Sequence, residues 1–185
     1  TILADEDAFD AAQLKVAVAA TAAIMVDDGD QATNGQYTEG QYIKFIATDG
    51  TVGIFILADS AETGAVSSGT VLTATSDLGT GVPSASLLAQ GTCVAVTTNL
   101  NTTTQAGVLN EIRDTMGAST SPLLNKISGA AGTASGDGNQ SITFTQAIPG
   151  TAGHTVTTTD IFELTAPDFA SGVDGGGVSK LDISA

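Results

Sequence analysis

Residues 141–159 read SITFTQAIPGTAGHTVTTT, an alternating apolar and threonine-rich pattern interrupted by Pro149 and Gly150. In an extended chain the apolar side chains of Ile142, Phe144 and Ile148 fall on one face, because side chains alternate with a period of two. The threonines between them fall on the other face, where a β-branched hydroxyl residue suits the surface of a sheet. A proline-glycine pair then ends the strand, and Gly153 is expected at positive φ. The stretch therefore predicts a strand, a glycine-containing turn and a second, threonine-rich strand.

A resemblance rests on the letters ITxTQxxxGTAGxTxxTT, followed by Phe169, Gly172 and the glycines at 175–177. This arrangement resembles a recurrent β-rich module in structural proteins of tailed bacteriophages. In that module an ITLTQ-type strand leads to GTAGNT and a threonine-rich strand. His154 stands here where the module has Asn, and the closing region also departs from it. The resemblance implies a virion structural protein, and it identifies no catalytic residue.

Composition favours a fold built from short strands. The chain has 185 residues, of which 22 are glycine, 42% are hydrophobic and only 4% are aromatic. Charged residues make up 14%, against roughly a quarter in an average domain, which is typical of a subunit with surface buried in an assembly. We expect an α+β, mostly β fold: short antiparallel strands in a sandwich-like or sheet core, one amphipathic helix packed on it, and terminal arms.

The charge balance restricts the partners. Twenty acidic residues stand against five basic ones, which gives a net charge of -15. Phosphate groups would repel this chain, so direct nucleic-acid binding and attachment to an anionic membrane are not expected. The longest apolar run, residues 16–26, is too short to cross a bilayer. Two interpretations of the acidic surface stay open, namely solubility alone and docking onto a basic partner.

Three segments between residues 42 and 116 carry further predictions. The alternating runs at 42–58 surround Asp49-Gly50, a two-residue turn signal. Their apolar residues lie on both faces, which indicates burial on two sides, either between sheet and helix or at a subunit contact. Residues 59–90 are rich in Ser, Gly and Thr, and are expected to form a flexible insertion or a projecting loop. A helix is predicted at about 104–116, capped by Thr103 or Thr104.

The organisation expected is a core with two extensions. Residues 1–36 form an N-terminal arm or helix with an acidic loop, residues 37–172 the β-rich core, and residues 173–185 a C-terminal arm jointed by glycines. Within the first extension, residues 16–26 fit either an arm that adds to a neighbour's sheet or a segment packed on the chain's own core.

One cluster has the composition of a cation site. Asp27, Asp28, Asp30 and Asn34 supply closely spaced oxygen ligands of the kind that calcium prefers. Their spacing does not fit an EF-hand loop, and a carboxylate-rich turn without an ion is the alternative. No other cofactor is expected.

The residues that usually perform catalysis are scarce. Cys93 is the single cysteine, so it forms no internal disulfide, and its apolar surroundings predict a buried structural thiol. His154 is the single histidine and lies in a glycine-rich turn, where a hydrogen-bonded structural role is expected. Asp160 is near it in sequence but would have to be brought round by the fold to orient a base. We therefore expect a protein that is not an enzyme.

Three functional hypotheses follow. The first is a decoration or cement protein on the outer surface of a tailed-phage capsid, whose partners are copies of itself and other virion proteins such as the major capsid protein. The second is a tail or fibre component that binds host glycans, with Tyr37, Tyr42 or Phe169 exposed along a groove. The third is a cellular surface-layer or adhesin module of similar composition.

Overall fold

A computed structural model describes residues 16–26, 37–130, 133–134 and 140–176 of the chain. The described elements, in chain order, are β1 (Thr21–Val26), β2 (Tyr42–Ile46), β3 (Val52–Asp59), β4 (Val71–Leu72), α2 (Ala85–Leu88), β5 (Thr92–Thr98), α3 (Gln105–Met116), β6 (Ile127–Gly129), β7 (Thr133–Ala134), β8 (Gln140–Gln146), the 3-10 turn η1 (Thr151–Gly153), β9 (Thr158–Thr159) and β10 (Leu164–Thr165).

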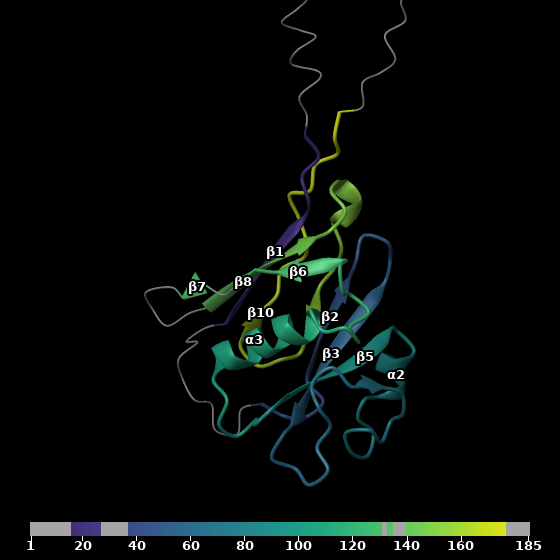
Figure 1. Ribbon diagram of the computed structural model, residues 1–185, viewed down its shortest axis with the longest axis vertical. Coiled ribbons are helices and arrows are strands. Elements are labelled where there is room, and N and C mark those ends of the chain that lie inside the picture. The colour runs from purple at the N-terminus through teal and green to yellow at the C-terminus, as the bar shows by residue number, and fades with distance from the viewer. Residues whose placement is uncertain (1–15, 27–36, 131–132, 135–139, 177–185) are drawn as a thin grey trace, which may run out of the picture.

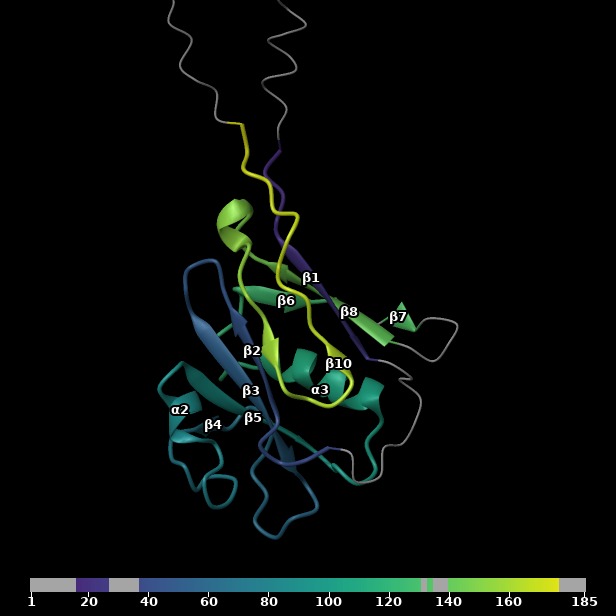
Figure 2. The same ribbon diagram turned by 180° about the vertical axis from the view of Figure 1, so that it is seen from behind.

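The strands form two sheets that share one hydrophobic core (Figures 1 and 2). The first, called the β3 sheet, has the strand order β4-β5-β3-β2-β9. The second, called the β8 sheet, has the order β10-β1-β8-β6, with β7 also paired to β8. Helix α3 contacts strands of both sheets and closes the core between them. The fold is thus α+β, mostly β and sandwich-like, as the sequence predicts.

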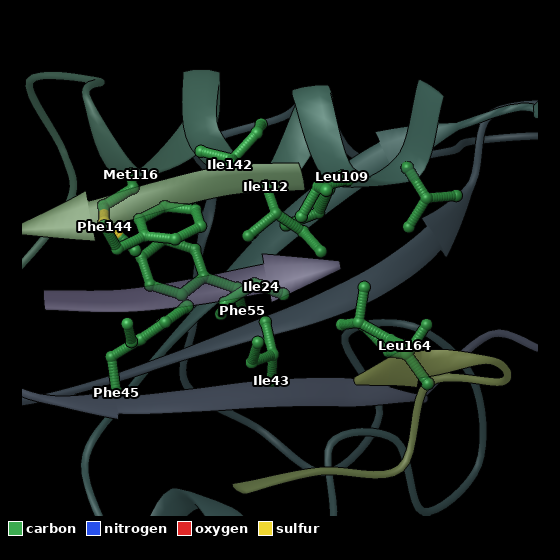
Figure 3. Close-up of a cluster of buried hydrophobic side chains, with 14 of the residues drawn as sticks. Ile24, Ile43, Phe45, Phe55, Leu109, Ile112, Met116, Ile142, Phe144 and Leu164 are labelled. Atoms are coloured by element: carbon green, nitrogen blue, oxygen red, sulfur yellow. The ribbon is translucent and has the colours of Figure 1, made fainter. Parts of the chain in front are cut away.

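Aromatic rings from both sheets meet at the centre of this core. The Phe45 ring lies 6.1 Å from Phe55, 5.1 Å from Phe144 and 6.3 Å from Phe169, measured between centroids. All four side chains are buried. Figure 3 shows the apolar side chains of α3 lying over this group. Because so few aromatic residues are available, their concentration at one point leaves aliphatic side chains to fill the rest of the core.

Helix α3 confirms the sequence prediction at both ends. The hydroxyl of Thr104 accepts the N–H of Gly107 at 3.0 Å, which is the N-cap contact expected there. Gly117 follows the last helical residue, although its φ of -79° is right-handed. The predicted apolar face is fully buried and consists of Val108, Leu109, Ile112 and Met116.

The β2–β3 hairpin turns where the sequence predicts, but its loop is longer. The N–H of Ala47 donates to the carbonyl of Thr51 at 2.8 Å, so three residues, not two, form the loop. Gly50 has a φ of +83°, the left-handed conformation that closes a three-residue loop. The expected antiparallel arrangement holds for β2 and β3 but not for β3 and β5, which are parallel.

The crossover between the parallel strands β3 and β5 covers the outer face of the β3 sheet. Residues 59–90 were expected to be flexible or to project, and this expectation is wrong. Three of their leucines, Leu72, Leu78 and Leu87, are buried in one cluster with Ile54 and Ile56. They pack there because β3 carries apolar side chains on both faces, and both faces must be shielded from water. The predicted two-sided burial of the hairpin is confirmed, and the cover comes from the chain itself.

Residues 21–26 are an inner strand of the β8 sheet, with β8 on one side and β10 on the other. Ile24 is completely buried, whereas the next residue, Met25, is 48% exposed. The proposed N-terminal arm therefore does not extend to residue 36, because strand β1 belongs to the core. Residues 1–15, for which a short helix was expected, and 27–36 lie outside the described residues.

The stretch 141–159 crosses from one sheet to the other. It begins in β8, passes through η1 and ends in β9, which pairs with β2. The chain then returns to the β8 sheet at β10, which pairs with β1. Ile142 and Phe144 point into the core as predicted (Figure 3). Ile148 does not, because the strand ends at Gln146, and it is 54% exposed.

Candidate assembly surface

Two distant parts of the chain lie side by side at one end of the molecule (Figures 1 and 2). Val18 and Val173 exchange two backbone hydrogen bonds, at 2.8 and 2.9 Å. Thr21 and Ala170 exchange two more, both at 2.9 Å. The described N-terminal and C-terminal segments therefore leave the fold together. We call this region, with the turn described next, the terminal end.

The turn at residues 150–153 holds the two segments in place. The N–H of Gly150 donates to the carbonyl of Val18 at 3.0 Å. Thr151 donates its N–H and its hydroxyl to the two carboxylate oxygens of Asp174, each at 2.8 Å. Gly150, not Gly153, has the positive φ, at +120°. A Cβ atom on Gly172 would lie 2.3 Å from the Gly150 carbonyl oxygen, so only glycine fits this crossing.

The terminal end exposes apolar side chains. The three most exposed large apolar residues of the described chain are Val16 at 73%, Ile148 at 54% and Val156 at 54%. Val16 precedes the paired strand, and Ile148 precedes the turn. Val156 follows Thr155, whose carbonyl accepts the Phe169 N–H at 3.0 Å. Val16 thus exposes an apolar side chain on one of the two segments that continue beyond the described residues, while Ile148 borders the Lys126–Asp49 ion pair.

The opposite end is acidic. Strand β3 runs from the hairpin loop, near the terminal end, to Asp59 at the far end (Figure 1). Glu39, Glu62 and Asp77 line a hollow there. Burial, followed by repulsion from Glu62 and Asp59, raises the pKa of Glu39. The acidic hollow thus lies at the end of the molecule away from Val16, the most exposed large apolar side chain of the described residues.

The predicted calcium ligands cannot be placed. Asp27, Asp28, Asp30 and Asn34 all lie outside the described residues. Within the described ranges, no group of three or more His, Cys, Asp or Glu side chains has the arrangement of a metal site. The cation site remains a prediction from the sequence.

The residues weighed for catalysis lie in structural positions. Cys93 is buried between β3 and β4, and burial raises the pKa of its thiol to about 11. His154 is exposed, and its backbone N–H donates to the Thr151 carbonyl at 3.0 Å. Asp160 accepts the N–H of Tyr42 at 2.6 Å, on the edge of the β3 sheet.

The aromatic residues considered for glycan binding separate into two groups. Tyr37 and Phe169 are buried, so they cannot line an exposed groove. Tyr42 is half-buried and does line one, beside Asp160. Sequence reasoning missed the contact of Thr151 with Asp174. In the sequence, the only sign of this contact is the carboxylate of Asp174, two residues after the Gly172 of the phage-like pattern. Asp174 is far in sequence from the turn at Thr151 that it binds.

Comparison with known proteins finds no matching family model, curated protein or solved structure. Among the described residues, no helix has the length and apolar character needed to cross a membrane.

Proposed function

We propose that this protein is a non-enzymatic structural subunit of a tailed-phage virion, acting as a decoration or cement protein on the outer surface of the capsid. It attaches through the terminal end, to copies of itself and to other virion proteins such as the major capsid protein. The observation that carries the proposal is that the two outgoing segments leave the fold together beside the exposed Val16 and Val18, at the end away from the acidic hollow.

The apolar surface suits repeated weak adhesion. Fully burying one valine or isoleucine side chain contributes about 1.5 to 3 kcal/mol. More than half of the surface is exposed at Val16, Ile148 and Val156. An interface that covered one of these side chains would therefore gain more than half of that free energy. Modest contacts of that kind hold a subunit firmly when a symmetric shell repeats them many times.

The acidic end suits the solvent-facing side of a particle. With a net charge of -15, coated particles would repel one another and stay dispersed. The same charge argues against the packaged nucleic acid as the partner, since phosphate groups would be repelled. An outer position on the capsid, or on the tail, agrees with both points.

The residues of the phage-like pattern support the proposal through their structural roles. Gln146 joins the two sheets, Gly150 allows the turn, and Thr151 binds the outgoing C-terminal segment. The pattern thus builds the terminal end and contributes no reactive group.

The proposal is tested by attachment to particles. Val18→Asp places a charge on the terminal end, where Val18 is 47% exposed, and Val71→Asp is the matched control on β4, where Val71 is 42% exposed. Each purified variant is mixed with capsids that lack the protein, and bound copies are counted after sedimentation and by electron microscopy. We expect Val71→Asp to attach like the original chain and Val18→Asp to attach at least tenfold more weakly. Equal attachment of the two variants, or no attachment by the original chain, would refute the proposal.

A further inference from the structure

A groove of about 330 Å³ lies between strand β2 and the segment that carries α2. It exists because residues 60–91 cover β3 and β5 but leave the outer face of β2 partly open, with Tyr42 half-buried. The apolar lining of the groove comes from Val82, Pro83 and Leu87. The position is remote from the terminal end, so the groove is not needed for the proposed attachment.

One wall of the groove is a rigid pair. The N–H of Tyr42 donates to Asp160 Oδ1 at 2.6 Å, and the N–H of Asp160 donates to the Tyr42 carbonyl at 3.2 Å. Gln41 Nε2 donates to the Asp160 carbonyl at 3.2 Å. Within the described part of the chain, Asp160 Oδ2 makes no hydrogen bond and is available to a ligand. An aromatic ring and a carboxylate are therefore held next to each other along one side.

The other wall carries hydroxyl and amide groups. Ser84, Ser86 and Gln90 line it. Gln90 is held in place because its Nε2 donates to the Ser86 carbonyl at 3.1 Å and its Oε1 accepts Lys44 Nζ at 3.0 Å. Since Lys44 belongs to β2, this contact also joins the two walls. The polar groups of the groove are thus fixed before any ligand arrives, which reduces the entropy lost on binding.

We infer that this groove binds a neutral saccharide. Tyr42 lines the groove, and an aromatic ring binds the weakly positive C–H groups of a sugar ring through its π face. Asp160 accepts hydrogen bonds from sugar hydroxyls, and the serine and glutamine side chains both donate and accept. The volume of about 330 Å³ is at the lower end of the range for small-molecule sites, roughly 300 to 1,000 Å³, and suits one or two sugar rings.

The charge of the site selects against acidic ligands. Among the described residues, Asp160 is the only charged one that lines the groove, and Lys44 of the neighbouring β2 already binds Gln90. The net charge of -15 adds a general repulsion of anions. Sialylated or phosphorylated glycans should therefore bind more weakly than neutral hexose or N-acetylhexosamine oligomers. This inference goes beyond the proposed structural role and does not depend on it.

The test uses the full chain and defined sugars. Chitobiose, lactose, maltotriose and sialyllactose are titrated and followed by saturation-transfer NMR and by tyrosine fluorescence. The chain has two tyrosines and no tryptophan, so a ligand on Tyr42 changes a large share of the signal. We expect at least one neutral sugar to saturate with a Kd on the order of 1 mM or tighter, and sialyllactose to bind more weakly than lactose.

Variants locate the site. Asp160→Asn keeps an oxygen for the Tyr42 N–H but removes the charge, and it should weaken binding about tenfold. Tyr42→Ala should abolish saturable binding, with circular dichroism used to confirm that the variant is folded. Leu124→Ala, in the separate groove between α3 and β6, is the control and should bind normally. Saturation by no neutral sugar, or binding that Asp160→Asn leaves unchanged, would overturn the inference.

Discussion

Gln146 and Thr48 connect the two sheets through a buried amide. Gln146 Oε1 accepts the backbone N–H of Thr48 at 3.0 Å and its hydroxyl at 3.1 Å. The amide nitrogen donates to the Ile46 carbonyl and to the Thr155 hydroxyl, both at 2.9 Å. Gln146 is 1% exposed, and its amide thereby uses both its oxygen and its nitrogen. A fully satisfied polar group of this kind fixes how the sheets sit relative to each other.

Replacing this amide should destabilise the fold strongly. Gln146→Leu keeps the volume but leaves the Thr48 N–H without its acceptor, at about 1 to 3 kcal/mol for a buried unsatisfied group. The Ile46 carbonyl loses one of two donors, since it still accepts the Thr155 hydroxyl at 2.6 Å. We expect a total loss of about 3 kcal/mol in the free energy of unfolding, measured by urea denaturation. The exposed Gln90, changed to leucine, is the control and should shift stability by no more than about 0.5 kcal/mol. Similar values for the two variants would contradict the role assigned to Gln146.

The crossing of Gly172 over Gly150 makes a second prediction. Gly172→Ala would bring a methyl group to 2.3 Å from the Gly150 carbonyl oxygen, so one of the two segments must move. We expect a loss of about 1 to 3 kcal/mol, together with faster hydrogen exchange in residues 16–21.

Gly117→Ala is the matched control, because its Cβ would lie 3.5 Å from the nearest atom, the Asp114 carbonyl oxygen, and its φ is negative. It should leave both measurements nearly unchanged. Normal exchange at residues 16–21 in Gly172→Ala would show that the two segments are not held together by this turn.

Local patterns predicted the elements and the β2–β3 hairpin, but not the strand pairings between distant segments. The alternation of Ile142 and Phe144 and the apolar stripe of α3 depend only on neighbours in sequence, so a β strand and a helix follow directly. The parallel pairing of β3 with β5 depends on how residues 60–91 pack, which no local pattern encodes. The same limit applies to β9 and β10, which lie close in sequence but in different sheets.

The sequence predicted only part of the terminal end. Residues 16–26 consist almost entirely of apolar side chains, most of them small. A strand of this composition can pair with its own sheet or with the sheet of a neighbouring subunit. In the structure β1 pairs within its own chain, because β8 and β10 occupy both of its edges. Both strands lie more than a hundred residues away in the sequence, so the local pattern does not reveal this pairing. The exposed Ile148 is a further example, because its apolar character alone predicts burial and only the end of β8 explains its exposure.

Stability should pass through a maximum in mildly acidic solution. Burial, followed by charge repulsion, raises the pKa of Glu39 and of Glu111 in the folded protein. A carboxyl with a raised pKa binds its proton more tightly in the folded state, so stability increases as the pH falls from neutral toward that pKa. The hydrogen bond from Lys126 lowers the pKa of Asp49, and backbone N–H groups lower that of Asp77. Their stabilising effect is present at neutral pH and is lost as the pH falls below about 4.

Thermal denaturation between pH 3 and pH 8 should therefore give the highest midpoint temperature at about pH 5. Glu39→Gln, which retains an acceptor for the Asp59 N–H, should flatten the decline from pH 5 to pH 8. Asp49→Asn should instead flatten the decline on the acid side. A midpoint that rises steadily up to pH 8 would contradict this account.

Neighbouring residues of β1 allow a direct test of its place in the core. Ile24 is 0% exposed and contributes to the packing between the sheets, while Met25 is 48% exposed. Ile24→Ala should cost about 2 to 5 kcal/mol of unfolding free energy, because it opens a cavity in a closely packed interior. Met25→Ala should cost well under half as much, since its side chain already lies largely in solvent. If β1 were an arm that docks only on a neighbouring subunit, both variants would unfold like the original chain when dilute, and only assembly would suffer. Urea denaturation of dilute protein distinguishes the two cases, and the strand position predicts a large difference between the variants at every protein concentration.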